Sequence, residues 1–382
     1  MQFRDLNRQY QKLQAEIDQG IAGVITTSAF ISGKPVQELE ERLAEYVGVK
    51  HCISCGNGTD ALQLALIAWG IGEGDVVFVP DFTFFSSAEV VSAVGATPVF
   101  VDVDEHTFNL DVIKLKQAVE RITKETELIP RVIVAVNLFG LPADFDGIRD
   151  VAGKYGLKIL EDAAQGFGGS IRGKYACSFG DIATTSFFPA KPLGCYGDGG
   201  AIFTDDDEIA EQLRSLRIHG KGASKYDNVR IGMNSRLDTI QAAILLPKLN
   251  AFIKYELERV NEIARLYTSL LNHVVLTPDI PEGRMSSWAQ YTIQLTGADE
   301  RDSLQAYLKS QDIPSMIYYQ KGMHQQRAFE DVCGLSCDLE VTEKLCGQVL
   351  SLPMHPYLEK DEIQRIADTI IDWKRNYEKN CR

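Results

Sequence analysis

The stretch around Lys191 combines a long amine with residues that stiffen and open the chain beside it. Prolines stand at positions 189 and 192, and glycines follow at 194, 197, 199 and 200. Proline fixes its own φ and keeps the preceding residue out of the helical region, whereas glycine lets the backbone approach a partner closely. A lysine in such a stiff turn suits Schiff-base chemistry, because desolvation or a neighbouring cation lowers its pKa. The alternative is a solvated surface lysine, which the aromatic and proline neighbours disfavour.

A second group that could do chemistry is a glycine turn between a strand and a helix. The pattern predicts a strand over 51–55 and a helix over 61–69, with Gly56-Asn57-Gly58-Thr59-Asp60 between them. A helix start offers free N–H groups and a positive dipole end, which suit a phosphate, and the Thr59 hydroxyl adds a donor. A tight turn with a helix N-cap is an equally good interpretation when the motif is taken alone.

Three further side chains complete a possible cofactor site. Asp162 ends an apolar stretch, so its carboxylate is placed to hold a cation or a protonated ring nitrogen, and Gln165 lies three residues on. Ser186 precedes Lys191 by five residues and is a candidate phosphate donor, while Phe84 is a candidate for stacking on a planar ring. Helix capping by Asp162 and core packing by Phe84 are the plainer alternatives. Together with the amine and the glycine turn, these groups describe a site for pyridoxal phosphate.

The elements that must position these residues alternate between strand and helix. Strands are predicted over 51–55, 75–80, 97–102, 131–136, 157–162 and 200–204, and helices over 35–47, 61–69, 87–94, 111–122 and 145–155. This alternation predicts a mostly parallel sheet with helices on both faces. Ligands of such sheets bind beyond the carboxyl ends of the strands, which is where Gly58, Phe84 and Asp162 fall.

Outside this alternating region, the sequence predicts other combinations of helix and strand. Residues 1–6 resemble a short strand, and a polar helix is predicted over about 7–20. Long helices are predicted over 238–249 and 253–271, then strands over 290–295 and 315–319 and helices over 301–311 and 360–377. We therefore expect an α/β protein with a large domain over 1–249, and a connector helix with a smaller α+β domain over 250–382.

The composition of the chain limits the classes of protein to which it can belong. The chain has 382 residues, 45% of them hydrophobic, and a formal net charge of −14, which disfavours binding to nucleic acid or to an anionic membrane. We find no apolar run long enough to span a bilayer and no signal-peptide core, so we expect a cytoplasmic protein. Cys52 and Cys55 have metal-like spacing, but no second pair matches it. We therefore expect buried free thiols and no metal.

Five motifs together resemble the sugar aminotransferases of the DegT/DnrJ/EryC1/StrS family over essentially the whole chain. In chain order they are Asn57-Gly58-Thr59-Asp60-Ala61-Leu62, Pro80-Asp81-Phe82-Thr83-Phe84, Glu161-Asp162-Ala163-Ala164-Gln165, Ser186-Phe187-Phe188-Pro189-Ala190-Lys191 and Asn234-Ser235-Arg236-Leu237-Asp238. The resemblance implies a pyridoxal 5'-phosphate-dependent transferase of fold type I that works as a homodimer with active sites at the subunit interface.

The same resemblance assigns roles to residues. It implies that Lys191 is tethered to the cofactor and moves the proton in transamination, and that Asp162 pairs with the pyridine nitrogen while Gln165 lies against the cofactor. The remaining cofactor contacts that it implies are phosphate contacts from Gly58, Thr59 and Ser186, a phosphate contact across the dimer from Asn234, and ring stacking by Phe84. Arg236 matches an arginine that reaches into the neighbouring substrate site. Glutamate is the usual amino donor, and Lys191 argues against the dehydratase branch, which has histidine there.

Within the family, the stretches 191–203 and 245–249 look most like the branch that acts on UDP-2-acetamido-2-deoxy-3-oxo-D-glucuronate, which makes diamino sugar acids for bacterial lipopolysaccharide, including O-antigen. Another 3-oxo or 4-oxo UDP- or dTDP-sugar is the alternative. The branch tends to read His-Tyr-Pro in its small-domain loop, where this chain has Tyr318-Tyr319-Gln320. Tyr319 and His324 of this loop are candidate substrate contacts, although His324 is equally readable as an ordinary surface histidine.

Two other classes of function compete. Gly56-x-Gly58-x-x-Ala61 between a strand and a helix resembles a dinucleotide fingerprint, which would suit an NAD-dependent sugar-nucleotide oxidoreductase. That reading leaves Lys191 and Asp162 unexplained. A cofactor-binding regulator without turnover is the third class, and the intact lysine and acid disfavour it.

Overall fold

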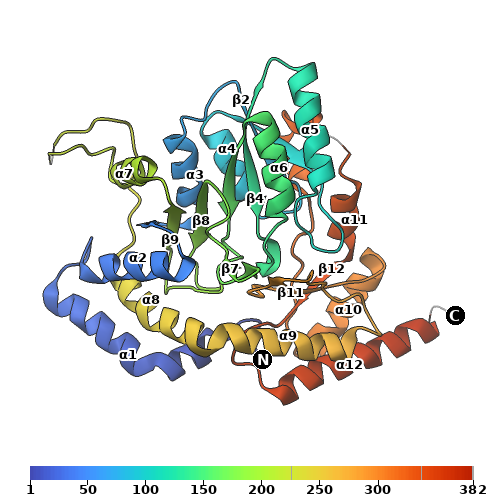
Figure 1. Ribbon diagram of the computed structural model, residues 1–382. Coiled ribbons are helices and arrows are strands. Elements are labelled where there is room, and N and C mark those ends of the chain that lie inside the picture. The colour runs from blue at the N-terminus through green and yellow to red at the C-terminus, as the bar shows by residue number, and fades with distance from the viewer. Residues whose placement is uncertain (225, 337, 381–382) are drawn as a thin grey trace.

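A seven-stranded sheet forms the centre of the molecule, which we describe from a computed structural model covering residues 1–224, 226–336 and 338–380 (Figure 1). Across the sheet the order is β1 (His51–Cys55), β9 (Gly200–Thr204), β8 (Ile182–Ser186), β5 (Lys158–Asp162), β4 (Ile129–Val136), β2 (Asp75–Pro80) and β3 (Thr97–Val101). Its neighbours are parallel from β8 through β5, β4 and β2 to β3, and only the pairings of β9 with β1 and β8 are antiparallel. The prediction of a mostly parallel sheet is confirmed.

Helices cover both faces of this sheet because its strands are apolar on both sides. Along β2, the side chain of Phe78 belongs to one buried cluster and those of Val77 and Val79 to the other. The first cluster is closed by α2 (Lys34–Val47), α5 (Val112–Glu125), α6 (Phe145–Tyr155) and α8 (Thr239–Ala251). The second is closed by α3 (Gly58–Ala68), α4 (Ser86–Ala93) and α7 (Asp207–Leu216). A strand buried on both faces reads as a continuous apolar run, which is why most of these strands were predictable.

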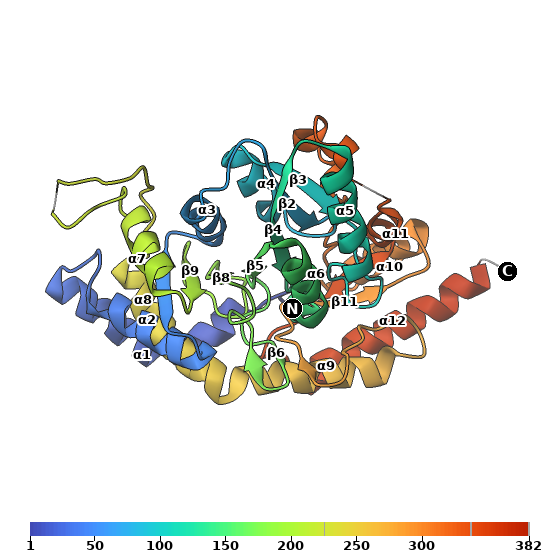
Figure 2. The same cartoon turned by 45° about the horizontal axis from the view of Figure 1, so that its top comes forward.

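One long helical element runs beneath the sheet to the C-terminal region (Figures 1 and 2). It consists of α8, a π-helical turn over Phe252–Glu256, and α9 (Leu257–Leu271). The first helix, α1 (Leu6–Thr27), packs against α8. The predicted domain boundary between residues 249 and 250 falls inside this element, and the division into two domains stays a prediction.

The C-terminal region is built on a two-stranded antiparallel sheet of β11 (Tyr291–Gln294) and β12 (Val349–Leu352). Around it lie α10 (Ala298–Ser310), α11 (Glu340–Gln348) and α12 (Lys360–Asn380), and α12 also packs on α9. The remaining elements are short: β6 (Ser170–Ile171), β7 (Lys174–Tyr175) and β10 (Arg284–Met285), and 3₁₀ turns over Leu138–Gly140, Met323–Gln325, Arg327–Phe329 and Cys333–Leu335.

Several predictions of local structure were wrong. The strand predicted over 315–319 is a loop in which only Met316 pairs with Ser351 of β12, because the chain turns away from β12 after this bridge toward Tyr318 and Tyr319. The first residues form no strand, and the helix that follows them extends to Thr27. The strands β8 and β12 and the helices α7 and α11 were not predicted from the sequence.

Cys52 and Cys55 are buried with free thiols, as expected. No helix within the described residues is both long and apolar enough to cross a lipid bilayer.

Candidate active site

A cavity of about 640 Å³ surrounds Lys191 at the carboxyl ends of the central strands. We call it the lysine pocket. Its walls come from the start of α3, the start of α4, the ends of β4, β5 and β8, and the loop that carries Tyr318 and Tyr319. Eight of the predicted site residues line it: Gly58, Thr59, Phe84, Asp162, Gln165, Ser186, Lys191 and Tyr319. This is the position where parallel α/β sheets bind ligands.

One part of the pocket wall is formed by the start of α3 and the end of β8. The Asn57 side chain caps α3 by accepting a hydrogen bond of 2.8 Å from the Asp60 N–H, so the helix begins at Gly58. A Cβ on Gly58 would lie only 2.8 Å from the Cβ of Ser186, which shows how closely the two elements approach. The Thr59 hydroxyl lies 2.8 Å from that of Ser86. A helix N-terminus with hydroxyl donors around it is a good anion site.

Asp162 lies at the end of β5 with its carboxylate held in place. Its Oδ2 accepts a hydrogen bond of 2.7 Å from the Ser87 hydroxyl, and its Oδ1 accepts one of 3.1 Å from the Ala164 N–H. The residue is buried yet lines the pocket. A buried carboxylate with spare acceptor capacity is suited to a cationic N–H of a ligand, because it is otherwise costly to bury.

Gln165 and two aromatic side chains form the wall toward the C-terminal region. Gln165 accepts a hydrogen bond of 2.7 Å from the Phe139 N–H, and its Nε2 donates one of 2.9 Å to the Tyr319 hydroxyl. Phe84 is 52% exposed, and its ring lies 6.4 Å from that of Tyr319 between centroids. An open aromatic face at a pocket is suited to stacking on a planar ligand.

Lys191 occupies a turn of residues 188–195, which we call the lysine turn. Its N–H donates to the Phe188 carbonyl at 2.8 Å, and the Cys195 N–H donates to the Phe187 carbonyl at 2.7 Å. The Nζ lies 5.9 Å from the centroid of the Phe84 ring. Burial lowers the pKa of the Lys191 amine, the charge of Asp162 acts against this, and the charge of Arg4 adds to it. A lysine with a lowered pKa is a better nucleophile and proton carrier.

The other predicted site residues lie outside the pocket walls. Asn234 is exposed, and Arg236 is half-buried two residues on. Between them, Ser235 fixes the segment to α3 by donating to Asp60 at 2.6 Å. His324 pairs instead with the buried Asp81, at 2.6 Å from Nδ1 to the carboxylate, and this hydrogen bond raises the pKa of the imidazole.

Some residues of the site were not predicted. Ser87 holds Asp162, Gln290 lines the pocket from the position just before β11, and Arg4 binds the main chain of the lysine turn. Glu161 supports the neighbouring Asp162 from the opposite face of β5, accepting hydrogen bonds from Asn137 and from the N–H groups of residues 177, 179 and 180. Among these residues, only Ser87 could have been predicted from the sequence, because it follows the motif that ends at Phe84 and stands at the start of a predicted helix.

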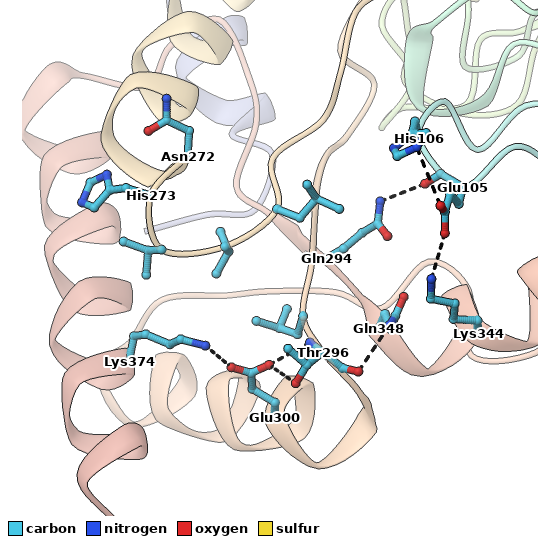
Figure 3. Close-up of a pocket in the computed structure, with 14 residues that line it drawn as sticks. Glu105, His106, Asn272, His273, Gln294, Thr296, Glu300, Lys344, Gln348 and Lys374 are labelled. Carbon is cyan, nitrogen blue, oxygen red and sulfur yellow. Dashed lines mark hydrogen bonds and ion pairs between the residues drawn. The ribbon is translucent and has the colours of Figure 1, made fainter. Parts of the chain in front are cut away.

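A second cavity, of about 590 Å³, lies between the end of α9, α10, α11, α12 and the loop that carries Glu105 and His106 (Figure 3). Its charged side chains are engaged with one another: Lys344 pairs with Glu105 at 2.8 Å, and Lys374 pairs with Glu300. It contains none of the predicted site residues. The lysine pocket is therefore the better candidate.

The residues present in the lysine pocket fit a phosphorylated pyridine aldehyde. The close approach of Gly58 and Ser186 makes an anion cradle, Asp162 offers a buried carboxylate, and Lys191 offers an amine with a lowered pKa. These are the groups that a phosphate, a ring nitrogen and an aldehyde require.

Comparison with protein families and curated proteins agrees with this fit. A model described as the DegT/DnrJ/EryC1/StrS aminotransferase family matches residues 11–371. The UDP-2-acetamido-2-deoxy-3-oxo-D-glucuronate aminotransferase of Pseudomonas aeruginosa is 46% identical over 97% of this chain and 100% of its own. A UDP-N-acetyl-3-dehydro-alpha-D-glucosamine 3-aminotransferase of Acidithiobacillus ferrooxidans is 41% identical over 96% of both chains. A dTDP-3-amino-3,6-dideoxy-alpha-D-galactopyranose transaminase of Aneurinibacillus thermoaerophilus is 38% identical over 97% of this chain and 98% of its own.

Solved structures give the same result. A DegT DnrJ EryC1 StrS aminotransferase from Brucella abortus superposes with a TM-score of 0.95, at 48% identity over 98% of this chain and 99% of that one. NtdA from Bacillus subtilis, solved with bound cofactor PMP, superposes with a TM-score of 0.87, at 29% identity over 98% of this chain and 83% of that one.

Proposed function

The chain belongs to the DegT/DnrJ/EryC1/StrS aminotransferase family, and we propose that it transfers the amino group of L-glutamate to UDP-2-acetamido-2-deoxy-3-oxo-D-glucuronate. The chain is a sugar aminotransferase that depends on pyridoxal 5'-phosphate. The proposal specifies the amino donor, the keto-sugar substrate and the catalytic and binding residues. It also assigns the product to bacterial O-antigen synthesis and the enzyme to the cytoplasm.

One observation carries the assignment of residues. The Lys191 amine has a lowered pKa and shares its pocket with the carboxylate of Asp162 and the anion cradle at Gly58. When bound, the cofactor supplies an electron-accepting ring that carries the amino group between the two substrates. Asp162 would keep the proton on the ring nitrogen, and Ser87 would hold Asp162 in position.

The other residues of the pocket bind and orient. Lys191 would remove the proton at Cα of the amino donor as a general base and return it as a general acid. Gly58, Thr59 and Ser186 would hold the phosphate, Phe84 would stack on the ring, and Gln165 would contact it. Tyr319 would meet the sugar, close to its hydrogen bond with Gln165.

We propose a homodimer in which Asn234 and Arg236 complete the site of the partner subunit. The support is their position: they follow a loop that extends away from the body of the molecule after α7 (Figures 1 and 2) and exposes Val229 and Ile231. Ile231 is 93% exposed, which is costly for a side chain left in water. Arg236 would bind the carboxylate of the sugar acid or of glutamate. We found no such support for a substrate role of His324, which is held by Asp81.

The keto-sugar is supported by the similarity to the enzyme of P. aeruginosa. The dTDP-sugar transaminase among the relatives keeps a 4-oxo or 3-oxo dTDP-sugar as the alternative. Tyr318, where the glucuronate branch tends to have histidine, lines the pocket, so this difference lies where the sugar would bind.

The first experiment tests the reaction class and the role of Lys191. Purified protein with pyridoxal phosphate is treated with borohydride, digested and mapped by mass spectrometry. We expect a phosphopyridoxyl group on Lys191, and none there after Lys191→Ala. A protein without this adduct that instead binds NAD would overturn the assignment in favour of an oxidoreductase. A protein with the adduct but no turnover of any sugar would favour a regulator.

The second experiment tests the substrate. Amination by glutamate is measured with 3-oxo and 4-oxo forms of UDP- and dTDP-sugars. We expect the 3-oxo UDP-sugar acid to be preferred by at least about 100-fold in kcat/KM, because a site that pairs with a carboxylate discriminates strongly against substrates without one. Turnover of only a 4-oxo-6-deoxy sugar would contradict the hexuronate assignment and leave the reaction class intact.

A further inference from the structure

The first five residues, which we call the N-terminal segment, connect the lysine turn to the C-terminal region. The Phe3 carbonyl accepts a hydrogen bond of 3.2 Å from the Met354 N–H, just after β12. The Phe3 ring meets that of Tyr318 edge-on, with 6.3 Å between the centroids. The segment is therefore fixed to the loop that lines the lysine pocket from the other side.

Arg4 makes the connection to the lysine turn itself. Its Nη2 donates to the main-chain carbonyl of Lys191 at 2.7 Å and to that of Pro192 at 3.3 Å. The Lys191 N–H meanwhile donates to the Phe188 carbonyl. The peptide groups on both sides of the Lys191 side chain are thus held, which limits how far the amine moves. A rigid guanidinium is well suited to binding two adjacent oxygens.

Arg4 also brings a charge into a buried compartment. Burial lowers the pKa of Arg4 to about 10, with Glu256 acting in the opposite direction, so the guanidinium stays protonated at neutral pH. The same charge opposes protonation of Lys191, Lys248 and His355. The groups of negative charge nearby are Glu256, which faces Arg4, and Asp162, which faces Lys191.

We propose that Arg4 is a positioning residue for transamination, which fixes the main chain of the lysine turn and holds its positive charge against the Lys191 and Pro192 carbonyls. This inference rests on the proposed function, in which Lys191 is the reacting amine. The hydrogen bonds of Arg4 go to the lysine turn, so in the proposed reaction it acts through the position and charge of Lys191. Two consequences are separable: the charge adds to the effect of burial on how readily the amine takes up a proton, and the hydrogen bonds limit where the amine lies.

The test measures the protonation of Lys191 directly in the cofactor-free protein. The full chain carries its purification tag at the C-terminus, so that residues 1–5 stay native. Lys191 is acetylated with trace acetic anhydride between pH 6 and 11, and the extent is read by mass spectrometry. We expect Arg4→Gln to move the midpoint upward by about 0.5 to 1 pH unit, because it removes a neighbouring like charge. Arg4→Lys, which keeps the charge, should stay within about 0.3 unit of the unchanged chain.

Activity of the holoenzyme provides the second readout. For both Arg4 variants we expect kcat to fall about tenfold while KM for glutamate changes less than twofold, as for a group that orients the reacting amine. Arg8→Gln is the matched control, because Arg8 ties α1 to Glu362 and the Tyr357 carbonyl but makes no hydrogen bond to the lysine turn. Arg8→Gln should leave the acetylation midpoint and kcat unchanged.

Two results would overturn the proposal. One is an unchanged midpoint and kcat in Arg4→Gln. The other is an equal change in Arg8→Gln, which would trace the effect to the anchoring of α1 and not to Arg4. If Arg4→Gln does not fold, Arg4→Lys still tests the hydrogen bonds through kcat. Failure of the proposed function appears separately, as the absence of a phosphopyridoxyl group on Lys191 in the unchanged chain.

Discussion

At the scale of single residues, the chemistry of the pocket follows from which charges are buried together. Arg4, Lys191, Lys248 and His355 are basic groups that share one interior region with the carboxylate of Glu256. Burial disfavours the charged form of each, and their mutual repulsion adds to this effect. The environment that lowers the pKa of Lys191 also makes its basic neighbours costly to protonate.

His355 should make the protein sensitive to mild acid. The side chain is 2% exposed, and burial together with the charge of Arg4 lowers its pKa to about 4. The unfolded chain takes up this proton near pH 6.5, so the free energy of unfolding falls as the pH drops from about 6.5 toward 4. At pH 5 the expected loss from this residue is about 2 kcal/mol.

Urea denaturation at pH 7.5 and pH 5.0 measures this loss. His355→Leu should shrink the difference between the two pH values by about 2 kcal/mol, whereas His273→Asn, at an exposed position, should leave it unchanged. An equal pH difference in the unchanged chain and in His355→Leu would contradict the prediction.

At the scale of elements, the site depends on how closely α3 approaches β8. A methyl group at Gly58 would lie 2.8 Å from the Ser186 Cβ, so Gly58→Ala must push the helix start away from the strand end. We expect the dissociation constant for pyridoxal phosphate to rise about tenfold, since the anion cradle opens. Titration of cofactor into the cofactor-free protein measures it.

Gly23→Ala is the matched control for this prediction. Gly23 lies inside α1, and a methyl group there meets nothing within 4 Å. Alanine favours a helix over glycine, so this variant should be up to about 1 kcal/mol more stable and should bind the cofactor normally. Normal cofactor binding by Gly58→Ala would show that the cradle is not formed by this contact.

The helix α8 contains a lysine whose burial should reduce stability. Lys248 is 1% exposed, its Nζ has no hydrogen-bond partner within the described part of the chain, and it lies 4.7 Å from the centroid of the Tyr196 ring. Burial lowers its pKa to about 8. Because the unfolded chain holds this proton up to about pH 10.5, stability should rise as the pH increases from 8 toward 10.5.

Lys248→Met tests this account. Methionine removes the buried amine but keeps a side chain of similar length. The free energy of unfolding at pH 7.5 should therefore rise by about 2 kcal/mol, a net value that includes the lost contact with Tyr196. It should also flatten the rise in stability above pH 8. Urea denaturation at pH 7.5 and 9.5 gives both quantities, and a less stable variant would show that the amine is satisfied in the folded protein.

The elements that the sequence predicted and those that it did not differ in a physical way. Strands such as β4 are continuous apolar runs, so their ends, and with them Asp162, could be located from local pattern alone. The strand β8 is Ile-Ala-Thr-Thr-Ser, with little apolar character, yet it lies between β5 and β9 and ends at Ser186. Arg4 could not be found either, because its partners are 187 and 188 residues away in the chain.

At the scale of the whole molecule, the proposed dimer makes a quantitative prediction. If each site takes Lys191 from one subunit and Arg236 from the other, Lys191→Ala and Arg236→Ala chains are each inactive alone. In mixed dimers one of the two sites is intact. With random pairing half of the dimers are mixed, so about a quarter of the normal activity should return.

Co-expression with two different tags, followed by assay of the mixture, measures this recovery. A mixture of Lys191→Ala with Asp162→Ala is the matched control, because both residues line the same pocket of one chain and no mixed dimer regains an intact site. No recovery in the first mixture would mean that Arg236 serves its own subunit or neither.

The order of strands in the sheet has a consequence for the chain as it leaves the ribosome. The edge strand β1 ends at Cys55, and its neighbour β9 begins at Gly200. The strand β1 therefore cannot pair with β9 until roughly 150 more residues have been synthesised. At about 5 to 20 residues per second, translation leaves this apolar strand unpaired for roughly 10 to 30 s. The nascent polypeptide is thus most vulnerable to aggregation early in its synthesis, and a chaperone that shields the first hundred residues would raise the yield of native enzyme.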